Sequence, residues 1–194
     1  MQTHIIQTLS DAHKALARLI KDTDTINKIE SAAIAIISTF ENSGRIFSCG
    51  NGGSMCDAIH FAEELSGQFR KNRKGLPAAA ISDPGYLSCV SNDFGYEDVF
   101  SRWIESHADK GDCLLGISTS GSSRNVIKAA LLAKEKGITV ITLTGKPDSH
   151  LGKIADIDIC TPGGEFADRS QELHIKVIHI LIELIERKLF PENY

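Results

Sequence analysis

After Gly44 the chain alternates short apolar runs with segments of helical periodicity, and this alternation restricts the possible folds more than any other feature. The apolar runs that we expect to form strands are 45–49, 78–81, 112–117, 138–143 and 157–159. The segments with helical periodicity are 55–66, 86–90, 99–104, 123–136 and 165–189. Because strands that alternate with helices pair through right-handed crossovers, the sequence predicts an α/β fold. We expect a doubly wound, mainly parallel five-stranded sheet with helices on both faces.

Two amphipathic helices are expected before the sheet begins. Their apolar stripes contain Ile5, Leu9, Ala12, Leu16 and Ile20 in the first helix, and Ile26, Ile29, Ala33, Ile36, Ile37 and Phe40 in the second. Asp22 and Asp24 are candidate caps, and Gly44 is a candidate stop. A chain of 194 residues suffices for one domain with a full core. We therefore expect a single domain over 1–194, with a helical N-terminal segment at 1–43 and an α/β core at 44–194.

Charge and cysteine usage exclude several classes of protein. The net charge is −4, and the one basic cluster, 70–74, is expected to be a solvated loop, so nucleic acid is not expected as a partner. No apolar run approaches the roughly 18 residues of a membrane span, and the N-terminus lacks an apolar signal segment. The five cysteines are odd in number and form no C-x-x-C pair. These features predict reduced thiols, no membrane segment and a cytoplasmic location.

A hydroxyl-rich turn, Ser118–Ser123, separates the predicted strand 112–117 from the helix that follows it. Such a turn directs backbone N–H groups and the positive end of a helix at one point, which suits a phosphate. Serine and threonine at a helix start also act simply as caps, and both interpretations remain open. Five hydroxyls in six residues favour the anion.

A second turn, Gly50–Ser54, follows the predicted strand 45–49. Its adjacent glycines allow close approach of the backbone to a ligand, but they are equally typical of a tight connection between strand and helix. The chain contains neither a G-x-G-x-x-G dinucleotide motif nor a G-x-x-x-x-G-K-[ST] loop. Ligands of parallel sheets bind beyond the carboxyl ends of the strands, where both turns and Ser82–Asp83 are expected.

His60 and Glu64 lie four residues apart on the predicted helix 55–66, so both side chains project from one face. This spacing suits metal ligation or an acid–base pair, although it is also common in simple surface contacts. In the last helix, Gln171, His174 and His179 interrupt a strongly apolar pattern. A buried imidazole needs a polar partner, and for His174 we expect a core residue bonded to a carbonyl.

Five blocks of the chain resemble a known family. They are SCGNGGSMCDAIHFAEELSG (48–67), SNDFG (91–95), GISTSGSSRNVIKA (116–129), VITLTGK (140–146) and ADRSQELHIKVIHILIELIE (167–186). In this order, over nearly the whole chain, they are similar to the phosphoheptose isomerases of the sugar isomerase (SIS) domain class. The resemblance implies conversion of sedoheptulose 7-phosphate to D-glycero-D-manno-heptose 7-phosphate, the first step towards the heptose of the lipopolysaccharide core in Gram-negative bacteria.

The resemblance also implies roles for individual residues. The family's substrate-binding positions match Asn51, Gly52, Gly53, Glu64, Asn92, Asp93, Ser118, Thr119, Ser120, Ser123, Asp168 and Gln171. Its metal-binding positions, implied to hold one zinc ion per active site, match His60, Glu64, Gln171 and His179. Glu64 and His179 match the catalytic positions. A carboxylate and an imidazole suit an enediol mechanism, which needs a base and a group that transfers protons between oxygens, although a Glu64 that binds metal is a weaker base.

Two other classes of function remain open at this stage. One is a non-catalytic SIS-domain regulator that acts by protein contact, of the type that associates with the bacterial replication initiator. Retention of the four residues at the metal-binding positions argues against it. The other is an isomerase of a different ketose phosphate, because a sequence does not measure the length of a substrate.

Helix geometry predicts how the metal site is assembled. Gln171 and His179 lie eight residues apart, which is about 12 Å along a helix and about 80° around it. Zinc–ligand bonds measure only about 2.0–2.2 Å, so these two side chains cannot easily meet at one ion. We therefore expect one of them to reach the site from a second subunit of a homo-oligomer, which the resemblance implies to be a tetramer.

Overall fold

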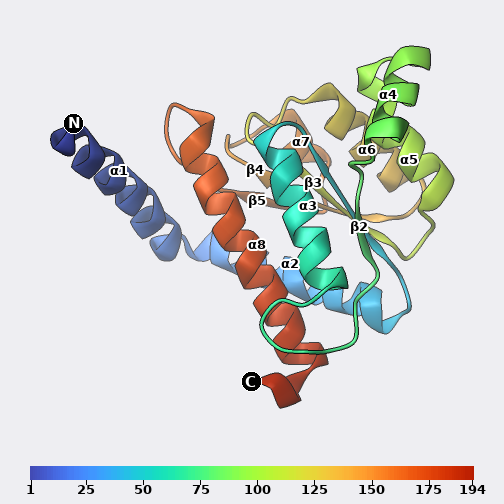
Figure 1. Ribbon diagram of the computed structural model, residues 1–194, viewed down its shortest axis with the longest axis horizontal. Coiled ribbons are helices and arrows are strands. Elements are labelled where there is room, and N and C mark those ends of the chain that lie inside the picture. The colour runs from blue at the N-terminus through green and yellow to red at the C-terminus, as the bar shows by residue number, and fades with distance from the viewer.

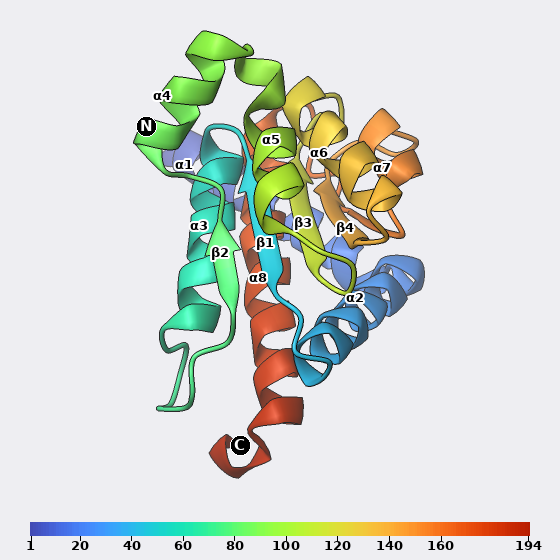
Figure 2. The ribbon, with the colours of Figure 1, turned by 90° about the vertical axis from the view of Figure 1, so that its right-hand side faces the viewer.

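A computed structural model describes residues 1–194, and it contains one parallel sheet between two layers of helices (Figures 1 and 2). The sheet order is β2-β1-β3-β4-β5, with every neighbouring pair parallel. The strands are β1 (Ile46–Gly50), β2 (Ala78–Ala80), β3 (Cys113–Ser118), β4 (Thr139–Thr144) and β5 (Ile157–Cys160). This arrangement confirms the predicted α/β fold. The predicted strand positions are right to within one or two residues at each end.

The helices divide between the two faces of the sheet. One face is covered by α2 (Thr23–Glu41), α3 (Gly53–Ser66) and α8 (Ala167–Leu189), which share an apolar core with the strands. The other face is covered by α4 (Pro84–Asp93), α5 (Val99–His107), α6 (Arg124–Glu135) and α7 (His150–Ile154). Strands β1 and β3 are buried along their whole length, which explains why they read as continuous apolar runs.

The N-terminal helices have different environments. Helix α2 packs its apolar stripe into the core, and its N-cap Asp22 accepts a hydrogen bond from the Thr25 backbone N–H at 3.1 Å. Helix α1 (Gln2–Lys21) projects beyond the body of the molecule (Figure 1). The expected stop at Gly44 is wrong by three residues: α2 ends at Glu41, and Ser43 reverses the chain with a φ of 63°.

Short elements and one charged residue differ from the expectations. Helix α7 and the 3-10 turns Tyr96–Asp98 and Pro191–Asn193 were not anticipated, because three to five residues are too few to show a period. The basic cluster 70–74 is not uniformly solvated, since the side chain of Arg73 is only 1% exposed. None of the helices combines the length and the apolar character that a membrane crossing requires.

The sheet order places the two predicted ligand turns side by side. Strand order reverses between β1 and β3, and parallel sheets of this order bind ligands at that point, beyond the carboxyl ends of the strands. Gly50, the last residue of β1, pairs with Ile117 of β3. The turn after Gly50 and the turn after Ser118 therefore lie next to each other at the carboxyl edge of the sheet.

Candidate active site

The turn after β1 is held in place by an amide pair. Asn51 Nδ2 donates to Asn125 Oδ1 at 2.9 Å, and Asn125 Nδ2 donates back to Asn51 Oδ1 at 2.8 Å. The Tyr96 hydroxyl also donates to Asn51 Oδ1, at 2.9 Å. Asn125 is 3% exposed and lies in the first turn of α6, so this pair ties the glycine turn to the hydroxyl-rich turn.

The two glycines of this turn have separate roles. Gly52 has a φ of 55°, in the left-handed region that side chains disfavour. At Gly53, a Cβ atom would lie 2.3 Å from Nε2 of Gln171, so only glycine leaves room for that amide. Gln171, on α8, therefore lies against the first residue of α3.

The hydroxyls of the second turn face one another. Ser118 Oγ lies 3.0 Å from Ser123 Oγ and 3.4 Å from Ser120 Oγ, and the Ser122 backbone N–H donates to Ser120 Oγ at 3.2 Å. Ser123 is the N-cap residue of α6, yet its side chain makes no capping hydrogen bond. The geometry therefore disfavours the capping interpretation, because the hydroxyl of the N-cap residue points into the turn.

A small hollow adjoins the hydroxyl-rich turn. It has a volume of about 150 Å³, and Thr119, Ser120 and Lys146 are among the residues that line it. The turn is fixed to the following loop, since the Gly145 backbone N–H donates to the Thr119 carbonyl at 3.0 Å. Convergent hydroxyls beside a lysine and a helix N-terminus provide the donors and the positive charge that a phosphate requires.

His60, Glu64 and His179 meet within one chain. His60 Nε2 lies 3.0 Å from His179 Nε2 and 3.6 Å from Glu64 Oε1. This contact forms because α3 and α8 run side by side (Figure 1), which brings residues 119 positions apart to facing positions. His179 lies on the exposed flank of α8 that faces α3, outside the buried stripe of that helix.

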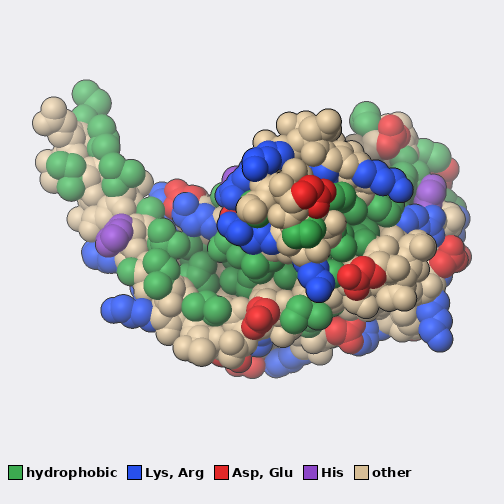
Figure 3. Space-filling view, turned by 90° about the horizontal axis from the view of Figure 1, so that it is seen from below, with side chains coloured by type: hydrophobic (Ala, Val, Ile, Leu, Met, Phe, Trp, Pro, Cys, Tyr) green, Lys and Arg blue, Asp and Glu red, His purple; other side chains and the backbone are tan.

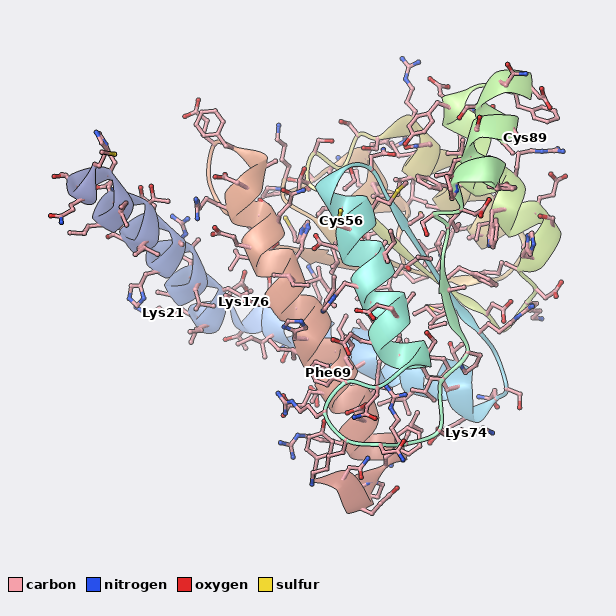
Figure 4. The ribbon with its side chains drawn as sticks, in the orientation of Figure 1. Lys21, Cys56, Phe69, Lys74, Cys89 and Lys176 are labelled. Carbon is pink, nitrogen blue, oxygen red and sulfur yellow. The ribbon has the colours of Figure 1, made fainter.

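The surroundings of this cluster shift the pKa of two of its members. Partial burial raises the pKa of Glu64, although the neighbouring His60 opposes the shift. Burial lowers the pKa of His179, and the positive charges of His60, Lys176 and Arg70 add to this effect. The ring of Phe69 lies 5.7 Å from the ring of His179 and forms part of its apolar surroundings. Phe69 and Lys176 are both labelled in Figure 4. In the metal-free chain, the carboxylate of Glu64 is therefore more basic than usual, and the imidazole of His179 favours its neutral form.

The two contacts of His60 have the spacing of ligands that share a zinc ion, and the donors that all lie within 4.8 Å of one another are those of His60, Glu63 and Glu64. Two ligands at about 2.0–2.1 Å in a tetrahedral site lie roughly 3.3 Å apart, and the two separations from His60 Nε2 bracket that value. The other ring nitrogen of His60, Nδ1, lies 3.3 Å from Glu63 Oε1. A carboxylate on that side holds the proton on Nδ1 and leaves Nε2 free to bind metal. Glu63 directly precedes Glu64 and lies three residues after His60, and it is an unanticipated third donor beside these two predicted ligands.

Gln171 does not join these donors within the chain. It lies against Gly53, seven residues before His60, which corresponds to about 10 Å along α3. Within the chain, His60 therefore contacts two of the other predicted metal ligands, Glu64 and His179, whereas Gln171 lies apart.

The remaining predicted residues lie at the ends of helices α4 and α8 or in the core. Asn92 and Asp93 end α4, both exposed, and Asn92 Nδ2 donates to Asp93 Oδ1 at 2.8 Å. Asp168 is exposed in the first turn of α8 and accepts from the Arg169 backbone N–H at 2.8 Å. His174 is fully buried, and its Nε2 lies 3.1 Å from the Thr144 carbonyl oxygen, which confirms the expected core role.

One further carboxylate on α3 was not anticipated. Asp57 lies on the same helix face as His60 and Glu64, three and seven residues earlier. Its Oδ2 is buried without a hydrogen-bond partner, and burial raises its pKa to about 6. The signal was available in the sequence as a third polar residue at helical spacing.

The chain is similar to known proteins of one family. The family model described as "SIS domain" matches residues 9–145. The chain is 54% identical over 188 residues to the phosphoheptose isomerase of Escherichia fergusonii, covering 97% of this chain and 98% of that protein. It is 55% identical to the phosphoheptose isomerase of Salmonella paratyphi B over the same shares.

Solved structures agree with the sequence relatives. The phosphoheptose isomerase from Neisseria gonorrhoeae superposes with a TM-score of 0.88 at 33% identity, covering 95% of this chain and 98% of that one. The phosphoheptose isomerase from Francisella tularensis gives 0.90 at 29% identity, covering 96% and 98%. With these matches over nearly its whole length, the chain belongs to the SIS-domain family and, within it, to the phosphoheptose isomerases.

Proposed function

We propose that this protein interconverts sedoheptulose 7-phosphate and D-glycero-D-manno-heptose 7-phosphate. The observation that carries the proposal is the pairing of a phosphate-sized group of hydroxyls after β3 with the His60–Glu64–His179 cluster on α3 and α8. The reaction takes place in the cytoplasm, as the first step towards the heptose of the lipopolysaccharide core, in line with the family resemblance.

The phosphate of the substrate binds at the turn after β3. Ser118, Ser120 and Ser123 offer hydroxyls that face one another, and the N-terminus of α6 adds its positive end. Asn51 and Gly53 belong to the turn after β1, which lies beside this phosphate anchor. The amide pair between Asn51 and Asn125 holds that turn in place. The sugar then extends from this anchor along α3 towards His60 and Glu64.

Replacing Ser118 and Ser120 together by alanine is expected to raise KM for the sugar phosphate by at least about a hundredfold. Each hydroxyl–phosphate hydrogen bond contributes roughly 1.5–3 kcal/mol, and backbone N–H groups remain to bind the anion. Steady-state kinetics would show the change chiefly in KM, while circular dichroism reports an intact fold. Ser106→Ala, which removes an exposed hydroxyl on α5, is the control and should leave KM unchanged. An unaltered KM in the double variant would rule out this turn as the phosphate anchor.

The side chains near the end of the sugar remote from its phosphate transfer the protons. Glu64 removes the proton from C1 of the ketose and returns it to C2, passing through an enediol. His179, whose environment favours the neutral ring, moves the hydroxyl proton between O1 and O2, so that no net proton enters or leaves.

A zinc ion completes this site in our proposal. His60, Glu64 and His179 would hold it, and Gln171 of a neighbouring subunit would supply the fourth ligand. When bound, the metal would polarise the substrate carbonyl oxygen as a Lewis acid. The spacing of His60 from Glu64 and from His179 supports this assignment.

A homo-oligomer follows from surfaces that the chain leaves uncovered. Helix α1 carries an exposed apolar stripe in which Ile5 is 59%, Ile6 68% and Leu9 65% exposed. In Figure 3, which views the molecule from below, helix α1 projects from one side of the body and carries green, apolar side chains. A hollow of about 300 Å³ between α2 and α8 adds Ile34, Ile37 and Leu184. Apolar surface of this extent is best buried by further copies of the chain, and the family resemblance favours a tetramer.

The proposed function is tested by following the purified protein with sedoheptulose 7-phosphate by NMR. Ketose phosphates of five and six carbons serve as competitors under identical conditions. We expect the C1 and C2 resonances of an aldose to appear from the heptulose phosphate, with exchange of the transferred hydrogen with deuterated solvent. Turnover of a shorter ketose phosphate in preference would assign the protein to another isomerase. No turnover of any of them would favour the non-catalytic alternative.

A further inference from the structure

The loop between α3 and β2 contains a buried arginine that the proposed mechanism does not use. Arg73 Nε donates to Glu186 Oε1 at 2.6 Å, and their side chains are 1% and 0% exposed. Few residues of the 67–77 loop are buried, and its neighbour Lys74, labelled in Figure 4, is exposed. Burying an arginine is costly unless its donors all find partners, so the contacts of Arg73 indicate what it holds together.

The remaining donors of Arg73 bind the end of α3. Nη2 donates to the Glu64 carbonyl at 2.7 Å, and Nη1 donates to the carbonyls of Leu65 at 2.8 Å and Gly67 at 3.0 Å. The last carbonyls of a helix have no partners within the helix, and a cation favours that end of the helix dipole. Arg73 therefore acts as the cap of the helix that carries His60 and Glu64.

The partner of Arg73 belongs to the helix that carries His179. Glu186 lies seven residues after His179 on α8, two turns further on nearly the same face and about 10 Å along the axis. Its second oxygen accepts from the Tyr194 hydroxyl at 2.9 Å, and the Phe190 ring lies 5.6 Å from the Arg73 guanidinium carbon. Each oxygen of the Glu186 carboxylate therefore has its own hydrogen-bond donor, Arg73 for one and Tyr194 for the other.

One rigid, planar group therefore joins the two helices whose relative position sets the active site. The 3.0 Å contact between His60 Nε2 and His179 Nε2 depends on how far α3 is displaced along α8. Metal sites tolerate deviations of only about 0.2 Å, and a displacement of about 1 Å can reduce a reaction rate by a factor on the order of a hundred.

We infer that Arg73 is a positioning residue, which fixes α3 against α8 and so maintains the spacing of His60, Glu64 and His179. The inference rests on the proposed function for its kinetic consequence, but the spacing itself is a property of the chain. Arg73 acts through the backbone of Glu64 and the side chain of Glu186, without touching the substrate.

The test compares Arg73→Lys with the wild-type protein. Lysine keeps the charge opposite Glu186 but lacks the planar fork that reaches three carbonyls at once. We expect Co²⁺ affinity, measured by chelator competition, to fall by about 10- to 100-fold, with a weaker visible Co²⁺ spectrum. We also expect kcat to fall by at least about tenfold, with KM changed by less than about twofold, because the phosphate turn lies at the other end of the site.

A matched control separates positioning from stability. Arg45→Lys alters another arginine, which pairs with the buried carboxylate of Asp112 at 2.8 Å, at the start of β1 and away from the site. It should lower Tm while leaving Co²⁺ affinity and kcat unchanged. If Arg73→Lys fails to fold, Glu186→Gln takes its place, since it keeps the helix cap and weakens the link to α8. It should change affinity and kcat in the same direction.

Failure of the inference and failure of the proposed function give different results. A wild-type protein without activity on sedoheptulose 7-phosphate would refute the function, whereas the Co²⁺ comparison would still test the positioning. Crystal structures of both proteins provide a readout that needs neither metal nor activity. A His60–His179 separation that is longer in the variant, or rings without a defined position, supports the inference. An unchanged separation, or wild-type Co²⁺ affinity in the variant, overturns it.

Discussion

Replacing Glu64 by glutamine is expected to lower kcat by a factor on the order of a hundred or more while the protein remains folded. Glutamine has nearly the same shape but cannot accept the C1 proton, and general base catalysis contributes roughly 10²–10⁴-fold to a rate. The side chain is only 18% exposed, so glutamine should occupy the same partly buried position without unfolding the protein. Steady-state kinetics with sedoheptulose 7-phosphate measures kcat, and the exchange of substrate hydrogen with deuterated water reports proton removal directly.

Metal content must be measured beside these rates, because Glu64 is also a proposed ligand. Glu64→Asp is the matched variant: it keeps the carboxylate but withdraws it by one methylene, so its kcat should lie between those of the wild type and Glu64→Gln. A Glu64→Gln protein with full metal content and near-normal turnover would place the base elsewhere, and Asp57 would become the first candidate on the same helix face.

Mixing Gln171→Ala subunits with Glu64→Gln subunits is expected to restore activity, although each variant alone should be inactive. Within one chain Gln171 lies against Gly53, whereas Glu64 lies with His60 and His179. If Gln171 reaches the metal of a neighbouring subunit, some mixed sites draw an intact Glu64 from one chain and an intact Gln171 from the next. In a symmetric assembly with random exchange, about a quarter of the sites are complete.

The structure supplies an internal control for this experiment. His179 and Glu64 belong to the same cluster in one chain, so His179→Ala mixed with Glu64→Gln should give no recovery. Subunit exchange is verified with differently tagged chains, and the assembly state by light scattering. Recovery with the His179→Ala mixture, or full activity in a monomer, would contradict the arrangement proposed here.

Hydrophobic periodicity was sufficient to predict the sheet and its covering helices. Strands β1 and β3 are buried on both faces and are apolar apart from Ser48 and Ser118, and long helices repeat their apolar positions over several turns. Both patterns depend only on residues close together in the sequence, so they can be recognised without knowledge of the fold. Helix α7, with five residues, spans little more than one turn and leaves no such period.

The chemistry of the site was also largely readable, because the motifs are contiguous in the chain. The hydroxyl-rich turn after Ile117 and the His60–Glu64 spacing each lie within one strand–turn–helix unit, where local geometry determines what the side chains can do. His174 was correctly assigned to the core, because a histidine surrounded by apolar helix positions needs only one carbonyl.

Contacts between distant segments were decided by the tertiary structure alone. The meeting of His60 with His179, the placement of Gln171 against Gly53 and the burial of Arg73 against Glu186 all depend on how α3 lies along α8. Periodicity shows which face of each helix is buried, but a helix can slide along its neighbour without changing that face. The axial position is set by packing and by a few directional bonds between residues more than a hundred positions apart, which no local pattern encodes.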